Sequence, residues 1–111
     1  MSDLRTRSCV PCEGGIPALS HADARRLLAQ TPGWALNDSA TEIGRTFEFK
    51  NFHETMAFVN AIAWIAHRED HHPDLEVGYR RCLVRYSTHA VNGLTENDFI
   101  CAAKINGLSG E

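Results

Sequence analysis

The chain has 111 residues, a formal net charge of −3 and six histidines. A length close to the usual domain size predicts a single domain and leaves no room for a separate dinucleotide-binding domain. The mild acidity argues against nucleic-acid binding, because the only basic cluster is formed by Arg80, Arg81 and Arg85.

The N-terminal residues show no apolar periodicity, so we expect a flexible arm over 1–15 ahead of one domain over 16–108. The arm has no signal-peptide core, and no apolar run approaches the roughly 20 residues of a membrane span, which predicts a cytoplasmic protein that binds no membrane. Its C-x-x-C pair, Cys9 and Cys12, lacks the two further ligands that zinc needs. We interpret the pair as exposed thiols, with a metal or redox role as the alternative.

The first half of the domain predicts a helix, two strands and a longer helix. A cap at Ser20 begins the first helix, and Pro32-Gly33 ends it. Short alternating segments at 34–36 and 41–50 flank a turn cluster and predict a hairpin. The helix over 52–69 is capped by Asn51. Its expected core stripe comprises Phe52, Met56, Val59, Ala63 and Ala66, widened by Phe58, Ile62 and Ile65.

The second half predicts two more strands and a last helix. Alternating apolar residues mark the strands: Leu75, Val77 and Tyr79 in one, and Cys82, Val84 and Tyr86 in the other. We interpret Cys82 and Cys101 as buried small hydrophobic residues. Thr95 and Asp98 have the spacing of a capping box at the start of the last helix, and Gly107 is expected to end it.

The predicted order is helix, strand, strand, helix, strand, strand, helix. Short connections between neighbouring strands favour antiparallel pairing. The fold class is therefore α+β, with a four-stranded antiparallel sheet covered on one face by helices. Because such a short sheet has free edges, we also expect a homodimer or homotetramer, although the sequence does not give the copy number.

The histidines carry the strongest chemical signal. We interpret His21 and His53, near helix starts, as surface residues. His67 and His71 are four residues apart and would share a face if one helix ran through both, which leaves a small histidine-rich metal protein as an alternative. The H-E-x-x-H zinc signature is absent, however, because Arg68 follows His67.

A second grouping of histidines points to proton transfer. His71 and His72 precede Pro73, and a bent segment there would let both approach one ligand; His89 is expected at the end of the fourth strand. Imidazoles give and take protons near neutral pH. Several around one cavity suit a reaction that needs an acid and a base together, such as loss of water from a carbinolamine. That reaction requires no metal, redox cofactor or covalent nucleophile.

These residues resemble the pterin-4a-carbinolamine dehydratase family. The match follows the family's fixed spacings through His67, the His71-His72-Pro73 run, Tyr79, His89 and Asp98. The segment STHAVNGLTENDF over 87–99 and the expected order of elements are also similar. The resemblance covers about residues 16–106, and the arm is similar to that of bacterial members that accompany phenylalanine hydroxylase.

The resemblance implies a hydro-lyase that dehydrates 4a-hydroxytetrahydropterin to quinonoid dihydropterin and so recycles the tetrahydropterin cofactor of aromatic amino-acid hydroxylases. It implies no cofactor, because the pterin is the substrate. His71, His72 and His89 match the family's three active-site histidines. We assign acid/base work to His71 and His89, and to His72 either orientation of the pterin or a share of the proton transfer. The implied pocket lining comprises Pro73, Thr88, Ala90 and Val91.

Two signature positions have uncertain roles. Many members carry an acidic residue at the position of His67, and Glu69 or Asp70 are candidates to replace it here. Asp98 is accounted for by helix capping alone. A different class of function also stays open, because some members act as dimerisation cofactors of a transcription factor or assist assembly of a large enzyme. A pure scaffold would not need the three histidines.

Overall fold

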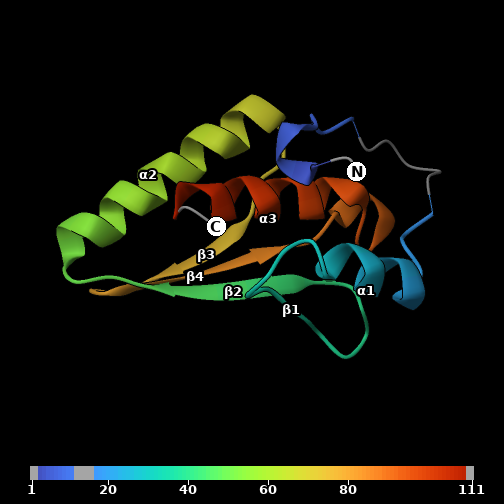
Figure 1. Cartoon of the computed structure of the whole chain (residues 1–111), viewed down its shortest axis with the longest axis horizontal. Coiled ribbons are helices and arrows are strands. Elements are labelled where there is room, and N and C mark those ends of the chain that lie inside the picture. Colours follow the sequence, from blue (N-terminus) through green and yellow to red (C-terminus); the bar gives the residue numbers. More distant parts are fainter. Residues whose placement is uncertain (1–2, 12–16, 110–111) are drawn as a thin grey trace.

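The computed structural model describes residues 3–11 and 17–109 (Figure 1). Its elements, in chain order, are η1 (Leu4–Thr6), α1 (His21–Leu28), β1 (Ala35–Leu36), β2 (Ile43–Glu48), α2 (Phe52–Glu69), β3 (Asp74–Val77), β4 (Arg81–Tyr86), η2 (His89–Val91) and α3 (Glu96–Leu108). The predicted α+β class and the order of the main elements are confirmed. None of the helices in the described residues is long and apolar enough to span a membrane.

The four strands form one antiparallel sheet in the order β1-β2-β4-β3. Strand β4 is central, and its inward residues Cys82, Val84 and Tyr86 are completely buried, as their alternation predicted. Helices α2 and α3 lie together over one face of this sheet (Figure 1). Among residues 3–11 and 17–109, no strand pairs with the outer edge of β3.

Helix α2 has the predicted bounds, and it buries only part of the predicted stripe. Its cap is as predicted, because the Asn51 side chain accepts a hydrogen bond from the Glu54 N–H. The buried residues are Thr55, Phe58, Ile62 and Ala66. Phe52 and Ala63 are exposed, which corrects the expected stripe. The ring of Phe52 stacks instead on Tyr79, outside the core, at a centroid distance of 6.2 Å.

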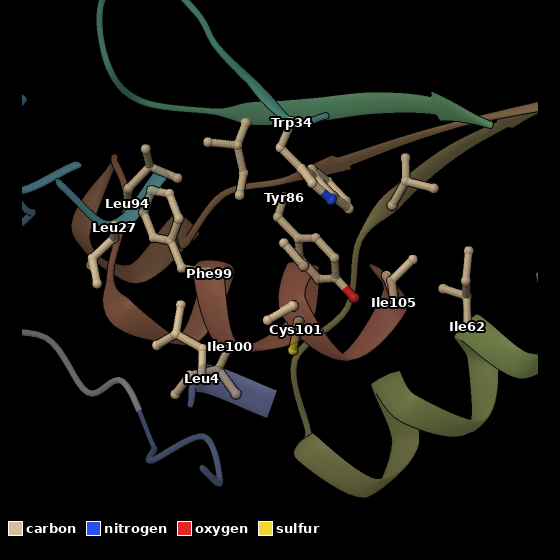
Figure 2. Close-up of a cluster of buried hydrophobic side chains, with 14 of the residues drawn as sticks. Leu4, Leu27, Trp34, Ile62, Tyr86, Leu94, Phe99, Ile100, Cys101 and Ile105 are labelled. Carbon is tan, nitrogen blue, oxygen red and sulfur yellow. The ribbon is translucent and has the colours of Figure 1, made fainter. Parts of the chain in front are cut away.

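Helix α3 runs through the centre of the molecule. It is buried on nearly every side, because the sheet, α2 and the N-terminal arm surround it. Figure 2 shows Tyr86 pointing from β4 toward α3, where Phe99, Cys101 and Ile105 lie. The capping box of Thr95 and Asp98 is present as predicted. Gly107 does not end the helix, which continues to Leu108.

Part of the N-terminal arm is packed against the domain. Leu4 in η1 is only 2% exposed and lies beside Ile100 of α3 (Figure 2). Lys104 donates a hydrogen bond to the Arg5 carbonyl, and Arg7 pairs with Glu96. The sequence analysis expected an exposed thiol at Cys9, but this residue is half-buried. Cys12 lies outside the described residues.

Candidate active site

A cavity of about 550 Å³ opens where five segments meet: the arm, the end of α2, the end of β4, η2 and the first turn of α3. Its lining residues are Cys9, Val10, Pro11, Arg68, Glu69, Asp70, His71, His72, Ser87, Thr88, His89, Ala90 and Asn97. The three histidines predicted to form a site therefore line one cavity.

The end of α2 places His71 and His72. The helix stops at Glu69 because Asp70 takes a left-handed conformation, with φ 51° and ψ 44°. The backbone N–H of His71 then donates to the Ala66 carbonyl at 3.2 Å. This turn directs the side chain of His71 toward α3, whereas His72 is exposed at the cavity.

The same turn separates His67 from His71. The shared helix face considered for a metal site does not exist, because α2 ends between the two residues. His67 is exposed and is absent from the described lining of the cavity. Within residues 3–11 and 17–109, no three His, Cys, Asp or Glu side chains lie close enough to hold a metal ion.

Asp98 is the buried centre of the site. Its side chain has no exposed surface, and its Oδ1 lies 2.6 Å from the Nε2 of His71. Its Oδ2 accepts hydrogen bonds from the Thr88 hydroxyl at 2.8 Å and from the Thr95 backbone N–H at 3.0 Å. Groups on three segments thus converge on one buried carboxyl group.

His71 is held between Asp98 and an aromatic ring. Its imidazole stacks on Tyr86 at a centroid distance of 5.6 Å and an interplanar angle of 5°, and its side chain is 11% exposed. Burial alone lowers the pKa of His71, but the hydrogen bond and negative charge of Asp98 outweigh burial and raise this pKa above its ordinary value. Asp98 therefore favours the imidazolium form, which is an acid.

The segment after β4 differs in detail from its prediction. Strand β4 ends at Tyr86, and Thr88 forms an isolated bridge with Gly93. His89 therefore begins the short helix η2 and does not end a strand; it is exposed at the cavity. Asn92, with φ 52°, closes this turn and returns the chain to α3.

The four expected pocket residues divide into two pairs. Thr88 and Ala90 line the cavity, whereas Pro73 and Val91 are not among the described residues that line it. The Thr88 hydroxyl also donates a hydrogen bond to Asp98, so this side chain helps to hold the carboxyl group in place.

Sequence reasoning missed two features of the site. It favoured capping for Asp98 and left open whether the residue is also functional, so the contact between His71 and Asp98 was not predicted. It also missed the wall formed by residues 9–11 of the arm, for which no periodic pattern exists.

The family model for pterin 4 alpha carbinolamine dehydratase matches residues 17–108. The chain belongs to the pterin-4a-carbinolamine dehydratase family. Relatives from Nitrosomonas europaea and Nitrosomonas eutropha are 61% and 59% identical over 107 residues, which cover 96% of this chain and 93% of each relative. Both carry the name "Putative pterin-4-alpha-carbinolamine dehydratase".

Two solved structures of dehydratase-like proteins share the fold. The transcriptional coactivator/pterin dehydratase of Brucella melitensis superposes with a TM-score of 0.79 and 34% identity, covering 84% of this chain and 99% of that one. A pterin dehydratase-like RuBisCO assembly factor of the alpha-carboxysome gives a TM-score of 0.62 at 20% identity, covering 71% and 92%. The second likeness extends to the fold alone.

Proposed function

We propose that this chain dehydrates 4a-hydroxytetrahydropterin to quinonoid dihydropterin by general acid/base catalysis. The observation that carries the proposal is the His71–Asp98 contact in a cavity also lined by His72 and His89. Membership of the dehydratase family supplies the substrate class. In the cell, the quinonoid dihydropterin would then need a separate two-electron reduction before the tetrahydropterin cofactor returns to an aromatic amino-acid hydroxylase such as phenylalanine hydroxylase.

His71 is the proposed acid. Its Nε2 faces Asp98, so Nδ1 is the ring nitrogen for the substrate. The raised pKa of His71, which Asp98 sustains against burial, keeps more of this ring protonated near neutral pH. Protonation of the 4a-hydroxyl turns it into water, a much better leaving group.

His89 is the proposed base, and His72 orients the pterin. As the C–O bond breaks, a proton leaves the ring nitrogen, and the C=N bond forms between this nitrogen and the ring carbon. Both histidines line the cavity with part of their surface exposed, where a ligand can reach them. Loss of water transfers no electrons, so the step needs only a proton donor and a proton acceptor, and the pterin is substrate rather than cofactor.

The pocket walls would hold the planar pterin through backbone groups. Thr88 and Ala90 already line the cavity. Pro73 and Val91 directly follow the lining residues His72 and Ala90 in the chain. We include Pro73 and Val91 as contacts that the bound substrate would make at the rim.

The proposal is tested by following the decay of freshly generated 4a-hydroxytetrahydropterin with and without the protein. The compound also loses water unaided, so the signal is an acceleration over that background. We expect acceleration in proportion to protein concentration. An unchanged decay rate at micromolar protein would remove the enzyme assignment.

A scaffold role is the second candidate, because the Brucella melitensis protein of the same fold is named both a transcriptional coactivator and a pterin dehydratase. Substitution of the histidines distinguishes the two roles. A scaffold would bind its partner equally well after His71→Ala and His89→Ala, whereas the enzyme would lose its acceleration.

A further inference from the structure

Two thiols from distant parts of the chain meet beside the site. Cys9 of the arm and Cys101 of α3 have their sulfurs 3.6 Å apart, and either thiol can donate to the other. Cys9 is half-buried and lines the cavity, whereas Cys101 is completely buried. Disulfide formation requires the sulfurs to come closer, which rotation about the side-chain bonds provides.

The backbone on both sides of Cys9 is already fixed. The Cys9 N–H donates to Glu69 at 2.8 Å. The Val10 N–H donates to the Asn97 side-chain oxygen at 3.1 Å, and the Asn97 amide donates back to the Val10 carbonyl at 2.6 Å. These contacts hold Cys9 against α3, so the two thiols are already adjacent and no further segment has to become ordered before a disulfide forms.

The pair also lies next to the proposed acid. Cys101 follows Asp98 by three residues on α3 and therefore lies on the same side of the helix, one turn on. The hydrogen bond from Cys9 lowers the pKa of the Cys101 thiol, and the positive charge of His71 acts in the same direction against burial. A more acidic thiol attacks a neighbouring oxidised sulfur more readily.

We propose that Cys9 and Cys101 form a redox-sensitive pair, oxidised to a disulfide by a hydroperoxide, which clamps the N-terminal arm as a fixed wall of the cavity. The proposal rests on the thiol geometry and does not depend on the dehydratase activity. In a reducing cytosol such disulfides are transient and report oxidation.

The chemistry balances in two steps. The Cys9 thiol, which lines the cavity, passes its proton to the Cys101 thiolate as its sulfur attacks one oxygen of hydrogen peroxide. The O–O bond breaks, Cys9 becomes a sulfenic acid, and the departing hydroxide takes the proton back from Cys101 and leaves as water. The Cys101 thiolate then attacks the Cys9 sulfur, the S–O bond breaks, and the departing hydroxide takes up from solvent the proton that Cys101 had released, so it leaves as a second water. The two thiols lose two electrons, and the peroxide gains them.

The test uses the full-length protein treated with increasing hydrogen peroxide, blocked with an alkylating agent and digested with trypsin without reductant. Trypsin places Cys9 and Cys12 in peptide 8–25, Cys101 in peptide 86–104 and Cys82 in peptide 82–85. Because Cys12 shares a peptide with Cys9, the decisive variant is Cys12→Ser. Cys9→Ser is the matched control, since it changes only the arm.

In the oxidised Cys12→Ser protein, we expect peptides 8–25 and 86–104 to be joined, with a mass two hydrogens below their sum. A dithiol should separate them again. The Cys82 peptide should stay alkylated. Hydrogen exchange of residues 3–11 should slow on oxidation in Cys12→Ser and not in Cys9→Ser. A link from Cys9 to Cys82, over-oxidation without a link, or no reaction would overturn the pair. In the wild-type protein, a disulfide confined to Cys9 and Cys12 would also contradict the proposed Cys9–Cys101 pair. Unchanged hydrogen exchange of residues 3–11 in the disulfide-linked protein would contradict the proposed clamping of the arm.

Discussion

Each oxygen of Asp98 binds a different part of the chain. One oxygen accepts from the start of α3 and from Thr88, and the other meets His71, which lies 27 residues earlier. The residue therefore joins a helix cap to a titratable ring in a single buried carboxylate. This sharing explains why its sequence spacing indicated capping and concealed the second contact.

At the scale of single residues, the Asp98→Asn substitution should lower the pKa of His71. The amide removes the negative charge that favours the imidazolium, so burial is left to favour the neutral ring. NMR titration of the imidazole resonances measures this directly, with the exposed His53 as an internal reference. A His71 midpoint equal to that of the wild type would show that Asp98 does not control the ring.

The same contact should make stability depend on pH. Because folding raises the pKa of His71, the contact stabilises the fold fully below the unfolded value near 6.5 and loses this effect as pH rises through the folded pKa. The free energy of unfolding of wild type minus that of His71→Gln should therefore be largest in mild acid and decline toward alkaline pH. A difference that is independent of pH, measured by urea denaturation, would contradict the linkage.

At the scale of elements, α3 organises the fold through polar contacts as well as apolar ones. Asn106 is almost fully buried near its end. Its oxygen accepts from the Trp34 indole at 2.8 Å and from Arg45 at 2.7 Å, and its amide donates to the Pro32 carbonyl at 3.0 Å. One side chain thus ties α3 to the segment before β1 and to β2.

Asn106→Ala should accordingly destabilise the protein by roughly 2–3 kcal/mol, because the buried Trp34 indole N–H loses its acceptor. Urea denaturation measures the change. The matched control is Asn60→Ala on the exposed face of α2, where a change within about 0.5 kcal/mol is expected. Equal effects at the two positions would refute the role of Asn106.

The elements themselves were predictable because their signals are local. The alternation of Cys82, Val84 and Tyr86 and the cap at Asn51 lie within a few residues of what they determine. The buried face of α2 was harder to predict, because Phe52 and Ala63 are as apolar as the residues that do enter the core. Which side turns inward depends on the packing of α3, a contact that no local pattern encodes.

At the scale of the whole molecule, the site is assembled from segments that are far apart in the chain. The histidine grouping could be predicted from spacing, whereas the contact of His71 with Asp98 and the arm at the cavity required the tertiary fold. The arm is a clear case, since Leu4 is the only residue of the described segment 3–11 that is fully buried, and one buried residue produces no periodicity.

The open edge of the sheet bears on assembly. Strand β3 leaves Val77 exposed at 43%, and nearby Tyr79 and Phe52 are exposed at 67% and 49%. We propose that a second copy covers this edge, in a homodimer or homotetramer. Light scattering should give a mass two or four times that of the chain, and the Val77→Lys substitution should shift the measured mass toward that of a single chain. A monomeric wild type at high micromolar concentration would contradict this proposal.

The central claim, a proton-handling site of histidines, is tested most directly by one rate: the decay of 4a-hydroxytetrahydropterin catalysed by His71→Ala, set against His53→Ala and wild type. His53 is exposed at the opposite end of α2 and serves as the matched control. We predict a loss of about 10²-fold or more for His71→Ala and a wild-type rate for His53→Ala. A folded His71→Ala protein that retains the wild-type rate would contradict the claim.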